Sequence, residues 1–233
     1  MTERRYRRIQ EVLARRQPDL TILAEDVYKP HNLSAMLRTA DAVGIGTIHA
    51  VRPTGGVPTF NATSGSAEKW VDLRVHEDLD AALATLRGAR MHVLAAHFSA
   101  EARRYDAVDY TRPTCIVFGN EKSGVTAACA EKVDGHVLIP MLGMVSSLNV
   151  SVAAAVILFE AQRQRRHAGF YDVPRLTPAE RNARALRWLH PHEAHAFDAL
   201  GLPLPQLEPD GSLPAAALAL LTAGHTGPPP GDA

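Results

Sequence analysis

The stretch CIVFGNEKSGV, residues 115–125, places a continuous apolar run directly before a loop bracketed by Gly119 and Gly124. An uninterrupted apolar run is typical of a strand buried on both faces, as in a parallel sheet. In an open α/β sheet, ligands bind beyond the carboxyl ends of the strands, and glycine lets the backbone approach them. A tight strand-to-helix turn also explains the two glycines, but it gives no reason for Glu121. The stretch therefore predicts a parallel sheet with a ligand loop at its carboxyl end.

Apolar runs and helical spacing continue this pattern on both sides. Strands are predicted at residues 20–24, 47–51, 71–75, 91–96, 114–118 and 136–139. Helices are predicted at residues 3–16, 32–43, 78–87, 126–133, 147–167, 178–189, 191–200 and 214–221. Because strands alternate with helices, we expect an α/β fold in which helices cover both faces of a parallel sheet.

A second segment, IPMLGMVSSLNVSVAAAVILFE at residues 139–160, joins a predicted strand to a long helix. Its Ser146, Ser147 and Asn149 lie at the expected helix start, where free N–H groups and the helix dipole attract an electron-rich ligand. The small residues that follow permit close helix packing. A capped, buried helix would explain these features too, but it does not require so apolar a preceding loop.

A third segment, HNLSAMLRTADAVGI at residues 31–45, predicts a helix that Gly44 ends. Asn32 could serve simply as its N-cap. Arg38 lies among mostly apolar residues, and a guanidinium near a core needs a carboxylate, a phosphate or carbonyl groups as partners. A structural and a functional role for Arg38 both remain open at this point.

The charges are unevenly distributed although the formal net charge is zero. Residues 1–20 carry six arginines against three acids, and residues 161–187 carry seven arginines against two acids. Arginine pairs well with phosphate, so these ends predict an anionic partner, with solvated helix faces as the alternative. The arginines expected to bind RNA are Arg4, Arg5, Arg7, Arg8, Arg15, Arg163, Arg165 and Arg166.

Several classes of protein are disfavoured by the sequence. No strand is followed by G-x-G-x-x-G, and in GNEKSGVT the second glycine is followed by Val125-Thr126 instead of the Lys-Ser/Thr pair of a phosphate-binding loop. The histidines of HPHEAH lack partners with metal-ligand spacing, so no metal is expected. No apolar run reaches the length of a membrane span, and Cys115 and Cys129 have no redox or metal spacing. A cytoplasmic protein without a membrane partner is expected.

The three segments together resemble the SpoU family of the SPOUT methyltransferases. NLSAMLRTADAVG, FGNEKSGV and IPMLGMVSSLNVSVAAAVILFE are similar to the three family motifs and occur in the family's order. The matching motif residues are Asn32, Arg38, Gly119, Glu121, Gly124, Ser147, Leu148 and Asn149. The neighbouring stretches ARRQPDLT, VYKPHNLSA, DYTRPTC and FEAQRQRRHAGFY resemble the TrmH branch, which methylates guanosine 18 of tRNA.

This resemblance implies a parallel sheet with a deep trefoil knot at its carboxyl end, a homodimer, and S-adenosyl-L-methionine as the cofactor. Short helical extensions are expected at both chain ends. The implied domains are residues 1–19 as a basic helix, 20–168 as the methyltransferase domain, 169–223 as a helical extension and 224–233 as a disordered tail. The cofactor contacts carried over are Ala96, Gly119, Glu121, Ile139, Met141 and Leu148.

The reaction implied is methyl transfer to a ribose 2′-hydroxyl, a weak nucleophile that loses its proton as it attacks. The resemblance assigns catalytic roles to Arg38, Asn32, Glu121, Ser147 and Asn149. Arginine is a poor base, so two roles for Arg38 stay open: assisting deprotonation with an RNA phosphate, or stabilising the developing alkoxide. The alternatives are a 2′-O-methyltransferase acting on rRNA and a non-catalytic RNA-binding protein. Only about 20 residues precede the first strand, which favours tRNA.

Overall fold

The computed structural model describes residues 3–51, 67–120 and 122–224 of the 233-residue chain. The described chain divides into two compact units. One unit is residues 16–173, which holds the sheet, and the other combines residues up to 15 with those from 174 onward. The predicted disordered tail lies almost wholly outside the described residues.

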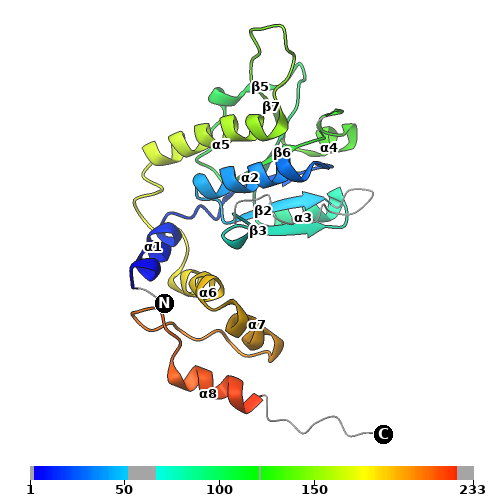
Figure 1. The fold of residues 1–233 in the computed structure, drawn as a ribbon. Helices are drawn as coiled ribbons and strands as arrows, with labels where there is room; N and C mark the ends of the chain where they lie inside the picture. Colours follow the sequence, from blue (N-terminus) through cyan, green and yellow to red (C-terminus); the bar gives the residue numbers. More distant parts are fainter. Residues whose placement is uncertain (1–2, 52–66, 121, 225–233) are drawn as a thin grey trace, which may run out of the picture. The chain divides into compact units, whose positions relative to one another are not determined.

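A parallel sheet forms the centre of the larger unit, and all its strands except β5 lie where the sequence predicted them (Figure 1). The strands are β1 (Leu20–Ala24), β2 (Thr47–Val51), β3 (Asp72–His76), β4 (His92–Ala96), β5 (Arg103–Arg104), β6 (Thr114–Phe118) and β7 (Gly135–Leu138). Among the described residues the order is β3-β2-β1-β6-β4-β7-β5, and every recorded pairing is parallel. The predicted parallel α/β fold is therefore confirmed.

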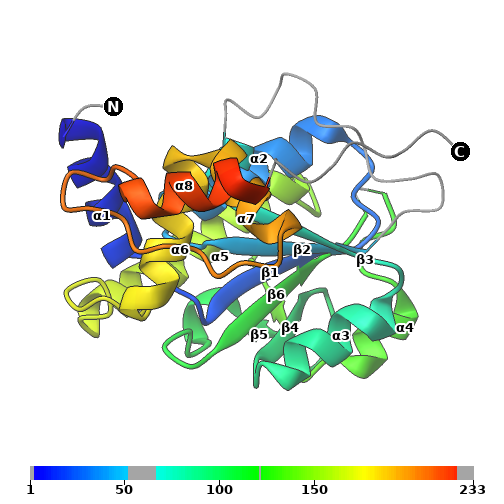
Figure 2. The same cartoon turned by 90° about the horizontal axis from the view of Figure 1, so that it is seen from below.

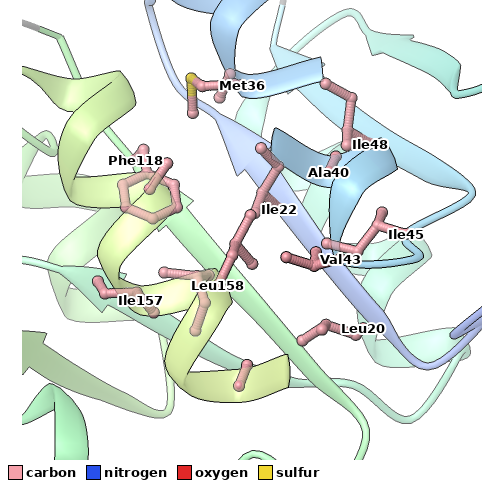
Figure 3. Close-up of a cluster of buried hydrophobic side chains, with 14 of the residues drawn as sticks. Leu20, Ile22, Met36, Ala40, Val43, Ile45, Ile48, Phe118, Ile157 and Leu158 are labelled. Atoms are coloured by element: carbon pink, nitrogen blue, oxygen red, sulfur yellow. The ribbon is translucent and has the colours of Figure 1, made fainter. Parts of the chain in front are cut away.

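Helices cover both faces of this sheet, which explains why the central strands β1 and β6 are buried along their whole length and apolar except for one threonine each (Figure 2). On one face lie α2 (Pro30–Ala42) and α5 (Val150–His167), and on the other lie α3 (Leu79–Gly88) and α4 (Ala127–Lys132). Figure 3 shows Met36 and Ala40 of α2 and Ile157 and Leu158 of α5 packed over Ile22. This packing holds α2 beside α5.

The smaller unit joins the two ends of the chain. It contains α1 (Glu3–Ala14), α6 (Pro178–Leu189), α7 (Pro191–Ala199) and α8 (Ala215–Gly224). Ile9 and Leu13 of α1 share an apolar core with Leu186 of α6. The N-terminal helix and the C-terminal extension, predicted as separate segments, thus form one unit.

Most element boundaries agree with the sequence prediction to within two residues, but the start of α5 and the end of α8 each differ by three. Helix α5 begins at Val150 rather than 147, because Asn149 is its N-cap and accepts a hydrogen bond from the Ser151 N–H. Helix α8 ends at Gly224 rather than 221. The two-residue strand β5 and the short 3-10 helices η1 (Ala67–Lys69) and η2 (Tyr105–Ala107) were not predicted. The trefoil knot remains a prediction.

Candidate functional site

The segments singled out in the sequence converge at one edge of the sheet. Strands β1, β6, β4 and β7 are neighbours, and parallel pairing brings their carboxyl ends together. Ala96 ends β4 and pairs with Val137 of β7. The loop from residue 119, the loop from residue 97 and the loop from residue 139 therefore leave the sheet side by side, where α/β proteins bind ligands.

The loop after β6 is folded tightly on itself. Asn120 and Gly124 exchange two backbone hydrogen bonds of 2.9 and 2.8 Å. A Cβ on Gly119 would overlap the carbonyl of Gly124 and the backbone N of Val125, while Gly124 has a φ of +71° that favours glycine. Both glycines are thus required by the backbone. Glu121 lies outside the described residues, so its predicted role stays a prediction.

Glu25 supports the same loop, and the sequence analysis missed it. This residue follows β1, is 4% exposed, and accepts hydrogen bonds from the Thr126 N–H at 2.9 Å and the Thr126 hydroxyl at 2.6 Å. Thr126 in turn is the N-cap of α4. A buried carboxylate needs such partners, so Glu25 fixes where the loop re-enters the fold.

The loop between β7 and α5 exposes apolar side chains to an unusual degree. Leu142 and Met144 are fully exposed, at 100% and 103% of their reference areas. Ile139, Met141 and Leu148, the predicted cofactor contacts, are half-buried. Exposed apolar side chains gathered in one loop, next to the proposed ligand loop, are typical of a binding surface.

A side-chain bond connects the first and third motifs. The Asn149 amide donates to the Asn32 side-chain oxygen at 3.1 Å, and Asn32 is buried. Ser147 is exposed, close to this bond along the chain. Arg38 is also exposed, and no hydrogen bond or ion pair is recorded between its side chain and any described residue. Helix α2 therefore turns Arg38 towards solvent, and its catalytic role stays a prediction.

The predicted RNA-binding arginines fall into two groups. The exposed group comprises Arg4, Arg5, Arg7, Arg8, Arg15, Arg163 and Arg166. Arg165 is fully buried, and its guanidinium donates to Asp19 at 2.6 Å and to the carbonyl of Tyr110 at 2.8 Å. The prediction that Arg165 binds RNA is wrong, because this side chain lies within the fold of the larger unit.

The sequence predicts neither a metal site nor a membrane-spanning helix. Among those residues, no group of three or more His, Cys, Asp or Glu side chains is arranged to hold a metal ion. Within the same residues, no helix has the length and apolar character that a membrane crossing requires.

Comparison with known proteins agrees with these features. Residues 19–159 match the SpoU rRNA methylase family, and residues 163–216 match its C-terminal region. The tRNA (guanosine(18)-2′-O)-methyltransferase of Thermus thermophilus is 63% identical over 177 residues, 76% of this chain and 91% of that protein.

Two solved structures share the fold. The TrmH/SpoU tRNA modifying enzyme of Aquifex aeolicus superposes with a TM-score of 0.75 at 37% identity, covering 80% of this chain and 95% of that one. The SpoU methyltransferase AviRb of Streptomyces viridochromogenes, solved with AdoMet, has a TM-score of 0.58 at 25% identity, covering 65% and 62%.

Proposed function

The chain belongs to the SpoU rRNA methylase family, and we propose that it methylates the ribose 2′-hydroxyl of guanosine 18 in tRNA, with S-adenosylmethionine as the methyl donor. The observation that carries this proposal is the Asn149–Asn32 hydrogen bond. It joins the cofactor-side loop before α5 to the helix that presents the exposed Arg38. The bond thereby links the proposed binding loop to the helix of an exposed cation, and methyl transfer to RNA can use both.

The residues at the sheet edge fit S-adenosylmethionine. The glycine loop at Gly119 brings backbone N–H and C=O groups close to a ligand, and Ala96 leaves room beside it. Ile139, Met141 and Leu148 would cover the faces of the adenine, with polar backbone groups at its edges. Glu121 belongs to the same proposed pocket by its place in the motif. When bound, the cofactor supplies a methyl group on a sulfonium, which is an intrinsically good leaving group.

The remaining chemical problem is the weak 2′-hydroxyl nucleophile. Arg38 offers a protonated guanidinium that can bind the neighbouring RNA phosphate and stabilise negative charge developing on the 2′ oxygen. Asn32, held by Asn149, orients the first turn of the same helix. Ser147 contributes a hydroxyl at the edge of the pocket. These residues position and polarise the nucleophile.

Exposed arginines would hold the tRNA backbone. Arg163 and Arg166 line a surface pocket with Gln162 and His167, at the C-terminal half of α5. In the smaller unit, four exposed arginines lie on α1 and a fifth follows it directly: Arg4, Arg5, Arg7, Arg8 and Arg15. Contacts of this kind set the position of an RNA without reading its sequence, and they weaken with salt.

The proposed enzyme is a homodimer. Val152 and Phe159, seven residues apart on α5, are 47% and 49% exposed, and Val156 lies between them on the same stripe. Leu142, Met144 and Val145 extend this apolar surface into the preceding loop. An exposed apolar stripe on an otherwise packed helix is suited to a second copy of the chain. Because tRNA is the substrate, we place the enzyme in the cytoplasm.

The test is transfer of label from S-adenosylmethionine to an unmodified tRNA transcript. The matched control transcript carries 2′-O-methylguanosine at position 18, in which a methyl group already replaces the proton of the 2′-hydroxyl, so that this ribose can accept no further methyl group. Label in the first transcript and none in the second supports the proposal. Label in both transcripts would show that the enzyme methylates another nucleotide of tRNA. Label only in rRNA would show that rRNA is the substrate. RNA binding without any label would indicate a non-catalytic protein.

A further inference from the structure

His136 on β7 makes side-chain contacts in two directions. Its Nδ1 lies 2.8 Å from the hydroxyl of Ser99, and its Nε2 lies 3.0 Å from the carbonyl of Ala130. The ring also meets the ring of His97 edge-on, with centroids 5.1 Å apart. The imidazole is half-buried, so these contacts occur in a partly dry environment.

The partners determine where the ring carries its proton. A backbone carbonyl can only accept, so Nε2 must carry a hydrogen and donate it to Ala130. In the neutral ring, Nδ1 is then an acceptor, and the Ser99 hydroxyl donates to it. In the neutral ring, each of the two contacts thus has a defined donor and acceptor.

These contacts join three elements that adjoin the loops of the proposed cofactor pocket. Ser99 lies in the loop that follows β4, three residues after Ala96. Ala130 lies in α4, which follows the glycine loop after β6. His136 itself lies on β7, three residues before Ile139. A backbone bond from His97 to Val137, 3.1 Å long, fixes the first of these loops to β7 next to the imidazole.

We propose that His136 is a positioning residue for the cofactor pocket, acting through Ser99 and Ala130 to hold the loop after β4 and helix α4 against β7, and so to hold the pocket loops that adjoin these elements. The inference rests on the proposed function, because it assigns these loops to S-adenosylmethionine. It adds residues that none of the three motifs contains. Ligand contacts are precise only when a supporting layer of side chains holds them, and His136 supplies that support here.

Ser99→Ala is the sharpest probe, because it removes one hydroxyl and leaves the histidine and its bond to Ala130 in place. We expect the Kd for S-adenosylmethionine, measured calorimetrically without RNA, to rise about threefold to tenfold, the effect of one hydrogen bond. At saturating cofactor, kcat and the KM for tRNA should stay within about twofold. His136→Ala should raise the same Kd further.

Coupling between the two residues separates this role from general weakening. In the double variant Ser99→Ala/His136→Ala, the loss of Ser99 should add almost nothing to the loss of His136. His136→Asn places an amide oxygen near the position of Nδ1 and should recover part of the affinity. Thr111→Ala is the matched control, since the Thr111 hydroxyl donates to Asp109 at 2.6 Å on the connection that leads into β6; it should leave the Kd unchanged.

An unchanged Kd in Ser99→Ala, or an equal rise in Thr111→Ala, would overturn the inference. Fully additive effects in the double variant would also overturn it. If the wild-type protein binds no S-adenosylmethionine at all, the proposed function itself fails. A wild type that binds and methylates while Ser99→Ala behaves identically rejects only the role of His136.

Discussion

The Asn149 side chain serves two partners at once. Its amide donates to the Asn32 oxygen at 3.1 Å, while its own oxygen accepts from the backbone N–H of Ser151 at 2.9 Å. The first bond links α2 to the loop before α5, and the second caps α5. The proposed catalytic geometry and the start of α5 therefore both depend on Asn149.

Two substitutions separate these tasks. Asn149→Ser keeps a good N-cap but is too short to reach Asn32, so its stability should stay close to wild type while methyl transfer falls about tenfold or more. Asn149→Ala should lose the same activity and also about 1 kcal/mol of stability. Chemical denaturation and single-turnover methylation measure the two effects. Full activity in Asn149→Ser would show that the link to Asn32 is dispensable.

Arg38→Ala should abolish most activity without destabilising the fold, because the side chain is exposed and makes no recorded bond to a described residue. We expect a fall in kcat of about 100-fold or more, the range for removing a group that stabilises developing charge. The midpoint of thermal unfolding should not move. Arg38→Lys should retain part of the rate, since charge remains but the planar fork is lost. A variant that binds tRNA and keeps near-normal kcat would contradict this role.

Arg165 and Arg166 are adjacent on α5 but should behave oppositely. Arg165→Ala leaves Asp19 without its buried partner and should cost about 3–5 kcal/mol of stability. Arg166→Ala should change stability by less than about 0.5 kcal/mol and weaken tRNA binding. It should also reduce the slope of log binding constant against log salt concentration by about one, the value for one lost phosphate contact. Denaturation curves and binding at several salt concentrations distinguish the two. Equal stabilities for the two variants would refute the assignment.

Gly119→Ala should collapse the glycine loop, because the added Cβ meets the carbonyl of Gly124 and the N of Val125. Backbone atoms cannot move aside as a side chain can, so we expect loss of S-adenosylmethionine binding and a clear fall in thermal stability. Gly88→Ala is the control, since nothing lies within 4 Å of the added Cβ there. Calorimetric titration with the cofactor checks both. Normal binding in Gly119→Ala would exclude the loop from the pocket.

Acid should destabilise the larger unit through His49. Burial, and then the nearby His76 and Arg74, lower the pKa of His49 from 6.5 to about 4. Between pH 4 and pH 6.5, His49 binds more protons in the unfolded chain than in the folded one. The stability that neutral, buried His49 contributes is therefore fully present above pH 6.5 and is lost as the pH falls towards 4. The full loss is on the order of 3 kcal/mol. Urea unfolding between pH 7.5 and 4.5 should show a shallower decline in His49→Gln; identical slopes would rule His49 out.

The sequence predicted the sheet well because each central strand is buried on both faces. The run at β6 is apolar except for one threonine, and the structure leaves none of its residues exposed. Strand β5 escaped prediction because Arg103 and Arg104 are two exposed charged residues without an apolar pattern. Strand order could not be predicted in the same way, because it depends on which distant segments pair. The pattern of apolar residues within one segment does not show this.

The site was only partly predictable for the same reason. Asn32 and Asn149 were found as motif residues, but their bond spans 117 positions and is visible only in the fold. Glu25 and Thr126 are 101 positions apart and belong to no predicted motif. Arg165 could have been recognised, because it follows Ala161 by four residues and Leu158 by seven, on the buried stripe of α5.

The smaller unit can complete its fold only late in synthesis, because its core combines residues from distant parts of the chain. Ile9 and Leu13 are synthesised before the sheet, but the other buried residues of their core, from Leu176 onward, are synthesised after it. Until those residues are made, α1 lacks the described partners of that core, and a short isolated helix is marginal in water. The N-terminal arginines therefore become a fixed surface only late in translation, after the sheet has been synthesised, so a nascent chain cannot grip tRNA in this way before its proposed cofactor pocket exists.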